Sequence, residues 1–277
     1  MKNNTKGIIY VLTAAIVFSL GGLLIKLINL SALAIASGRC IFSSLVFLIY
    51  FLVTKRKLVI NKTTILGCAL GLLNMLCYIV SNKLTTAANA IILEYTSSIF
   101  IIVFELIFFN KKPKRLDIIA SLIVLFGIVL VFVDGIQTSG VIGIIVALIG
   151  GMIYGLVLMA NSFEGGDSLS SMFMAHVLCA FIFMPKFIGE IANNFGSFSY
   201  LLILGVVQAG MGYLCISIGT KYCKPLTASL IASIEPILNP ILVAIFASET
   251  MNPLGIVGAS IVIITIIIYN YLSTKTN

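Results

Sequence analysis

Long apolar runs separated by short polar segments make up nearly the whole chain. The runs are continuous and roughly 20 residues long, the length that an α-helix needs to cross a ~30 Å hydrocarbon core. Strands of a membrane barrel would instead alternate apolar and polar residues. The pattern therefore predicts about ten transmembrane helices, at residues 8–28, 32–53, 63–82, 87–109, 116–133, 141–161, 169–188, 198–220, 225–247 and 253–272.

Composition supports this assignment to the membrane. Of 277 residues, 60% are hydrophobic and only 9% are charged, too few polar groups to cover the surface of a water-soluble protein. Within lipid, every backbone donor and acceptor must be satisfied inside the segment, which favours helices. We therefore expect an all-α polytopic membrane protein that lies in a lipid bilayer and acts between its helices, without a soluble domain.

The positive charges are distributed as expected for loops on one side of a membrane. The net charge is +8, a value that could indicate nucleic-acid binding. However, 13 of the 17 Lys and Arg lie near the termini and alternate short loops, at residues 2, 6, 55–57, 62, 111, 112, 114, 115, 221, 224 and 275. Cytoplasmic loops collect Lys and Arg in this way. The sequence predicts a multi-pass protein of the plasma membrane with both termini in the cytoplasm and no nucleic-acid partner.

The two halves of the chain resemble each other. Residues 14–20 align with 150–156, residues 70–74 with 204–208, and residues 86–94 with 227–235, at offsets of 134 to 141. Five predicted helices per half would invert the second half relative to the first, the plan of many secondary transporters. We predict two inverted five-helix repeats, residues 1–138 and 139–277.

Four ionisable residues are predicted near the middle of the membrane. Arg39 and Glu94 lie about seven residues from the outer ends of their helices, roughly 10 Å deep at 1.5 Å per residue, and His176 and Glu235 lie equally deep from the inner ends. Such groups are costly in lipid and usually face a partner or a cavity. They could form two structural ion pairs, Arg39 with Glu94 and His176 with Glu235. Alternatively, all four could line a cavity that binds a polar or zwitterionic substrate.

Further polar residues share helix faces with these four. The substrate-binding candidates are Arg39, Asn74, Tyr78, Glu94, Ser98, His176, Gln208, Tyr213, Glu235 and Asn239. Their amides and hydroxyls could bind a substrate or bond neighbouring helices. Glu105 lies near a helix end, where its carboxylate can extend toward Lys111 or Lys112.

Two prolines interrupt the ninth predicted helix. Pro236 follows Glu235, and Pro240 follows Asn239. Each proline removes a helical hydrogen bond about four residues back, and carbonyls freed in mid-membrane are buried in protein or face a wet cavity. Pro236 and Pro240 are therefore predicted hinges.

Enzyme and metal chemistry have little support. The chain has one histidine, and its six cysteines include no CxxC pair, so neither a zinc site nor a disulfide framework is indicated. A GxxxxGK[ST] nucleotide loop is absent as well. We expect no catalytic residues, no metal and no cofactor.

The chain resembles the drug/metabolite transporter superfamily, EamA type. The similar features are the two five-helix halves, Arg39 early in helix 2, the Glu235-Pro236 pair in helix 9 and the segment Phe246-Ala247-Ser248-Glu249 before helix 10. One departure is Tyr95, which stands where the first repeat would have a proline after Glu94. Whether helix 4 bends as helix 9 does is therefore open. The resemblance implies a central cavity, alternating access and small organic substrates.

The resulting hypothesis is a secondary transporter of small polar or amphipathic metabolites. Amino-acid-like substrates fit best, because Arg39 could bind a carboxylate and a glutamate could bind an amine. Export or exchange would be driven by a proton or a counter-substrate. The alternatives are an intramembrane enzyme or receptor, an importer and a drug-efflux protein, and the protein could be a monomer or a homodimer.

Overall fold

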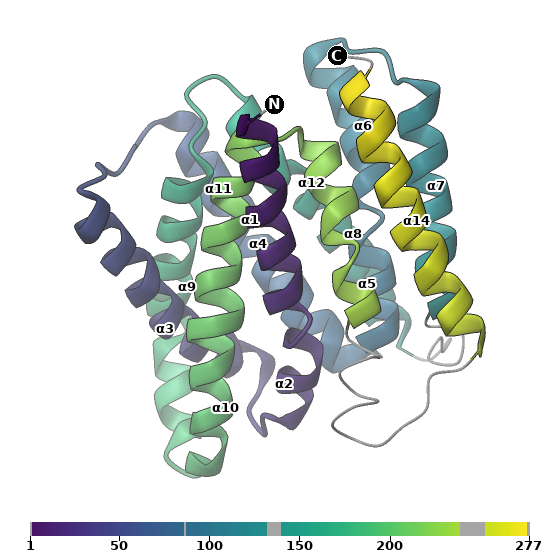
Figure 1. Cartoon of the computed structure of the whole chain (residues 1–277). Coiled ribbons are helices and arrows are strands. Elements are labelled where there is room, and N and C mark those ends of the chain that lie inside the picture. The colour runs from purple at the N-terminus through teal and green to yellow at the C-terminus, as the bar shows by residue number, and fades with distance from the viewer. Residues whose placement is uncertain (1, 86, 132–139, 239–252, 276–277) are drawn as a thin grey trace.

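The computed structural model describes residues 2–85, 87–131, 140–238 and 253–275, and helices are its only regular secondary structure there (Figure 1). The first half contains α1 Lys2–Phe18, α2 Gly21–Leu27, α3 Ala32–Thr54, α4 Lys62–Leu84, α5 Ala87–Glu94, α6 Ser97–Phe109 and α7 Arg115–Val131. The second contains α8 Val141–Leu158, η2 Ala160–Ser162, α9 Ser168–Ile191, η3 Phe195–Ser197, α10 Phe198–Ile203, η4 Leu204–Met211, α11 Gly212–Tyr222, α12 Pro225–Ala232 and α14 Pro253–Lys275.

Eight helical segments of the described chain are long and apolar enough to cross a membrane. They correspond to eight of the ten predicted spans, so the all-helical membrane architecture is confirmed. The other two predicted spans are represented by α7, which has 17 residues, and by the apolar helical stretch Pro225–Leu238. The remainder of the predicted span 225–247 lies outside the described residues.

Three predicted spans are interrupted. The first consists of α1 and α2, separated at Ser19–Leu20, and the fourth consists of α5 and α6, separated at Tyr95–Thr96. The eighth runs through α10, a π-helical stretch η4 and α11. Hydropathy predicts the length of a span, but these interruptions depend on local hydrogen bonding and occur frequently at functional sites.

Five of the helix pairs that join the two halves of the chain form a symmetric set. α3 packs against α9, α1 against α11, α4 against α8, α7 against α14, and α6 against α12. In order of the predicted spans, the pairs are 2–7, 1–8, 3–6, 5–10 and 4–9. When each span is replaced by its counterpart in the other half, five positions away in the order of spans, the same set of pairs is obtained. Two repeats related by a twofold axis would require this symmetry.

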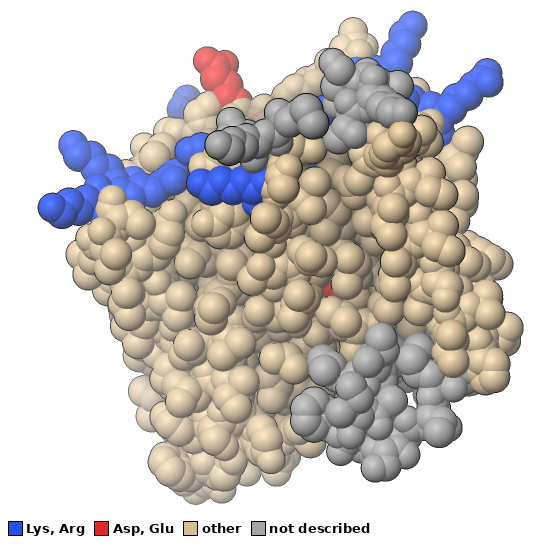
Figure 2. All heavy atoms as spheres, viewed as in Figure 1, with Lys and Arg blue, Asp and Glu red and all other residues tan. Residues whose placement is uncertain are grey.

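One end of the bundle is basic. Lys and Arg side chains gather at the end where both termini lie (Figures 1 and 2). At this end Lys111 Nζ lies 2.6 Å from Glu105 Oε1, which confirms that Glu105 extends toward a loop lysine. The shared position of the termini fits an even number of crossings.

The α3–α9 pair is connected at both ends. At the basic end, Arg56 forms an ion pair with Asp167, whose carboxylate also accepts from the backbone N–H of Ser170 at 3.0 Å. At the opposite end, Ser31 donates to Glu190 from its backbone N–H and its hydroxyl, both at 2.7 Å. Polar contacts therefore hold these two helices together on both sides of the bundle.

Candidate functional site

Both mid-membrane glutamates lie where a helix is interrupted. Glu94 is the last residue of α5. Glu235 begins a further helical segment, residues 235–238, after the turn that follows α12. This second break has a direct cause, because Pro236 has no N–H to donate to the carbonyl of Ala232 four residues earlier. Each carboxyl group thus extends from a helix terminus inside the bundle, where irregular backbone is enclosed by protein.

The break in the fourth span needs no proline. Thr96 Oγ1 donates to the carbonyl of Leu93 at 2.5 Å, and Ser98 Oγ donates to the carbonyl of Tyr95 at 3.2 Å. Hydroxyl side chains that bond nearby carbonyls compete with the regular helix. The helix is therefore interrupted at Tyr95, although the proline of the second repeat is missing there.

Gly151 of α8 allows this interruption to pack closely. A Cβ at position 151 would meet the carbonyl oxygens of Leu93 and Glu94 and the hydroxyl of Thr96. A larger side chain would push the end of α5, and with it Glu94, out of place.

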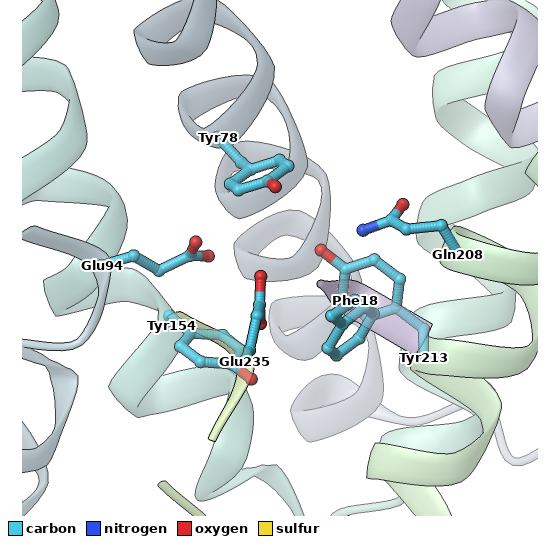
Figure 3. A pocket seen from close by; sticks show the side chains of 7 residues that line it. All are labelled: Phe18, Tyr78, Glu94, Tyr154, Gln208, Tyr213 and Glu235. Carbon is cyan, nitrogen blue, oxygen red and sulfur yellow. The ribbon is translucent and has the colours of Figure 1, made fainter. Parts of the chain in front are cut away.

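A small pocket lies between the two breaks. Its lining side chains point toward one another in Figure 3 and comprise Phe18, Tyr78, Glu94, Tyr154, Gln208, Tyr213 and Glu235. Two carboxyl groups, one amide and four aromatic rings thus face the same space. A second small hollow shares Tyr78 and Glu94 with it and continues past Ala90 and Ala147.

Six of the seven lining residues form three pairs at nearly the same offset in sequence. The members differ by 136, 135 and 141 positions, within the range by which the two halves align: Phe18 with Tyr154, Tyr78 with Tyr213, and Glu94 with Glu235. Each half of the chain therefore supplies one aromatic ring from its first span, one tyrosine from its third and one glutamate from its fourth.

Two buried polar atoms of the lining have no protein partner in the described structure. The hydroxyl of Tyr78 and Oε1 of Gln208 are buried and accept or donate no hydrogen bond. Buried polar atoms are nearly always satisfied, so such exceptions require an explanation. A polar ligand between these two groups would satisfy both.

Arg39 lies behind the pocket. Its side chain is fully buried, and none of its three guanidinium nitrogens bonds an acceptor among the described residues. Its Cζ lies 6.0 Å from the centre of the Tyr78 ring, and Tyr213 is another electrostatic neighbour. The ring of Tyr78, which lines the pocket, is thus a neighbour of this buried cation.

His176 packs between aromatic rings and does not line the pocket. Its Nδ1 lies 2.7 Å from the carbonyl of Met172, and its ring centre is 5.3 Å from that of Phe47 and 5.2 Å from that of Tyr213. The structure therefore places His176 one layer behind the site, in contact with a lining residue.

The remaining candidates are divided. Asn74 is buried outside the pocket lining, and both of its amide atoms lack a partner in the described structure. Ser98 is also buried, and its hydroxyl is used by the helix break. Pro236 adjoins the pocket through Glu235, whereas Asn239 and Pro240 lie outside the described residues.

The alternative of two structural ion pairs is wrong for this conformation. The structure instead pairs Arg56 with Asp167, Lys111 with Glu105, and Lys186 with Glu190, all near helix ends. Depth along a helix placed Arg39 and Glu94 at one level, but it does not specify the direction in which each side chain points.

Among the described residues, no three His, Cys, Asp or Glu side chains form a cluster that could hold a metal ion.

Sequence reasoning missed three residues of the site. Phe18 and Tyr154 line the pocket, and the alignment of residues 14–20 with 150–156 already paired them. Tyr95 was noted only as a departure from a pattern, but its hydroxyl lies 2.7 Å from Glu235 Oε2. Aromatic residues aligned between repeats were the usable signal for the first two.

Comparison with known proteins agrees with this architecture. The model of the EamA-like transporter family matches residues 5–133 and 141–271, nearly the entire chain. The chain belongs to the EamA-like transporter family. A solved crystal structure with 14% sequence identity superposes with a TM-score of 0.81 and 99% coverage of both chains, which shows that this EamA-like protein shares its fold.

Curated relatives of this EamA-like chain are named as transporters. An "Uncharacterized transporter" of Clostridium kluyveri is 29% identical over 69% of the chain, and one of Archaeoglobus fulgidus is 23% identical over 74%. Human "Solute carrier family 35 member G1" is 23% identical over 73% of the chain. The matches span 65% of the Clostridium protein, 75% of the Archaeoglobus protein and 54% of the human protein. The EamA-like chain is thus a multi-pass membrane protein of a transporter family.

Proposed function

We propose that this transporter moves a small zwitterionic, amino-acid-like metabolite across the plasma membrane by alternating access, as an exporter or an exchanger. The observation that carries the proposal is the pocket built from three repeat-related pairs. A site shared equally by two inverted halves can open to either side with the same chemistry. Proton or counter-substrate gradients would supply the energy.

The proposed architecture has ten spans in two inverted repeats, residues 1–138 and 139–277. Two observations support it: the symmetric set of helix pairs and the common offset of the lining residues. The gathering of Lys and Arg beside both termini supports a cytoplasmic location for that end.

The lining chemistry favours a small molecule with an ammonium group. Glu94 and Glu235 are carboxyl groups that can accept from it, and aromatic faces attract cations. Arg39, unpaired behind Tyr78, is the available partner for a carboxylate, to which a guanidinium can donate two parallel hydrogen bonds. In this conformation the pocket leaves only about 10 Å³ for a water-sized molecule, roughly the space of one water, so it must widen to admit a substrate.

Contacts between the two halves support a conformation that is closed at the basic end. Two loops of different halves are tied there by the Arg56–Asp167 ion pair, by Asn61 Nδ2 donating to Gly165 O at 2.8 Å and by Thr63 Oγ1 donating to Glu164 O at 2.8 Å. The second hollow continues from the pocket toward the opposite end, past Ala90 and Ala147. The three contacts at the basic end would have to break when the pocket opens to the cytoplasm.

Efflux of organic cations is the second candidate. The observation that favours it is that the lining itself contains two carboxyl groups and no Lys, Arg or His. An amine without a carboxylate would need only the glutamates and the aromatic rings, whereas a zwitterion also needs Arg39.

A thermal-shift screen on the purified full chain tests the proposal, because a ligand that binds only the folded state raises the melting temperature. The probes are the standard amino acids, together with a matched set of leucine, its decarboxylated analogue 3-methylbutylamine and its deaminated analogue 4-methylpentanoate. We expect zwitterions to stabilise the protein most, the amine less and the acid least.

Each other ranking has a defined meaning. Stronger stabilisation by the amine than by leucine would favour cation efflux. Stabilisation by the acid alone, or by no amino acid at concentrations up to the millimolar range, would contradict the proposed recognition of zwitterions.

A further inference from the structure

The hydroxyl of Tyr95 connects the two helix breaks. Tyr95 lies at the interruption of the fourth span and is almost fully buried. Its oxygen lies 2.7 Å from the carbonyl oxygen of Ala232 and 2.7 Å from Oε2 of Glu235. One phenol thus forms short contacts with a backbone carbonyl and with a carboxyl group of the ninth span.

Hydrogen atoms must be counted for these two contacts. A phenol has a single O–H donor, and a carbonyl oxygen can only accept. The carbonyl of Ala232 lacks its usual helical donor because residue 236 is a proline. A buried carbonyl without a partner is costly, so we assign the hydroxyl hydrogen of Tyr95 to the hydrogen bond that it donates to the carbonyl of Ala232.

The contact between Tyr95 and Glu235 then requires a second hydrogen. If Glu235 were ionised, one of the two 2.7 Å contacts would bring two oxygen lone pairs together with no hydrogen between them. If Glu235 is protonated, its carboxyl O–H donates to Tyr95, and Tyr95 donates to Ala232. Only the protonated form satisfies both contacts.

The charges around Glu235 also favour a proton there. Glu94, from α5, points into the same pocket, and two carboxylates in one site disfavour each other's ionisation. The other titratable lining groups are phenols, Tyr78 of α4, Tyr154 of α8 and Tyr213 of α11. The nearest basic groups, Arg39 of α3 and His176 of α9, are outside the lining.

The repeat is asymmetric at this point. Tyr95 and Pro236 stand 141 positions apart, as do Glu94 and Glu235, so the phenol occupies the place that the proline has in the second repeat. Pro236 frees the carbonyl that Tyr95 bonds. Glu235 therefore belongs to a relay, whereas no hydrogen bond to the Glu94 carboxyl is present among the described residues.

We propose that Glu235 is a proton-binding site, held by the relay Glu235 to Tyr95 to the carbonyl of Ala232, and that the ammonium group of a substrate displaces this proton. Tyr95 is the positioning residue of the site. The displaced proton passes to water on the side to which the pocket is open, and the Tyr95 hydrogen turns to the carboxylate. Ala232 then loses its donor, so the junction between the two breaks loosens. The displacement step rests on the proposed function, but the proton site does not.

Infrared spectroscopy of the purified full chain without substrate tests the proton site. The C=O stretch of a protonated carboxyl group should be present at neutral pH, vanish in Glu235→Gln, and shift in Tyr95→Phe because one hydrogen bond is lost. Glu105→Gln, at the basic end, is the matched control and should leave the band unchanged. An unchanged band in Glu235→Gln, or its loss in Glu94→Gln alone, would overturn the assignment.

Proton release on ligand addition tests the displacement step. In weakly buffered detergent solution, leucine should release about one proton per bound molecule from the unmodified protein and none from Glu235→Gln. Binding without release would refute the coupling and leave the proposed substrate class standing. Failure of leucine to bind would count against the proposed function, while the infrared result would still decide the proton site.

Discussion

Replacing Arg39 by methionine should raise the melting temperature and at the same time remove the preference for ligands with a carboxylate. The guanidinium is fully buried and bonds no acceptor in the described structure. Replacing a buried ion pair by apolar side chains of similar volume often stabilises a protein, by about 1–4 kcal/mol, and a buried charge without a partner is costlier still. If Arg39 binds the carboxylate of the substrate, its loss should bring leucine and 3-methylbutylamine to equal affinity.

Two control variants distinguish the effect of removing a positive charge from the effect of changing the side chain at position 39. Arg39→Lys keeps the buried charge and should give no stabilisation. Lys57→Met removes the same charge from an exposed loop and should change neither property. A strongly destabilised Arg39→Met protein, or one that still prefers leucine over the amine, would exclude a ligand-binding role for this residue.

Glu94→Gln should weaken the binding of both leucine and 3-methylbutylamine by at least tenfold. The substitution keeps the size of the side chain but removes the charge that would accept from an ammonium group. Charge-assisted hydrogen bonds contribute about 1.5–3 kcal/mol, and about 1.4 kcal/mol corresponds to a factor of ten in affinity. Thermal-shift titrations with both ligands measure the change.

Glu105→Gln is the matched control for this substitution. Glu105 lies in α6 of the same span but pairs with Lys111 at the basic end, so its loss should leave both affinities unchanged. Equal affinities for Glu94→Gln and the unmodified protein would mean that the ammonium group does not bind at Glu94.

Hydropathy predicted where the helices lie but not where they are interrupted. Eight of ten spans were placed within a few residues, because length and apolarity in lipid leave little choice. The break at Tyr95–Thr96 was left open, since it arises from hydroxyl groups that bond carbonyls locally. Proline is a strong signal for such a break, whereas a run of Thr and Ser is a weak one.

Part of the pocket lining was predicted for a similar reason, while the role of these residues in substrate binding stays a prediction. The predicted depth in the membrane identified Glu94 and Glu235, and shared helix faces identified Tyr78, Gln208 and Tyr213. All five residues line the pocket. Depth alone could not show that Arg39 and His176 point behind the lining. The repeat alignment contained more information than polarity did, because it also paired the aromatic residues that complete the pocket.

Counterflow in proteoliposomes tests the central claim most directly. Vesicles that contain the full chain are loaded with an unlabelled mixture of the standard amino acids, and uptake of the labelled mixture is followed. The account predicts uptake above that of protein-free vesicles, inhibition by external amino acids more than by their deaminated analogues, and loss of uptake in the Glu94→Gln, Glu235→Gln double variant. Uptake at the protein-free level, or undiminished uptake by the double variant, would contradict it.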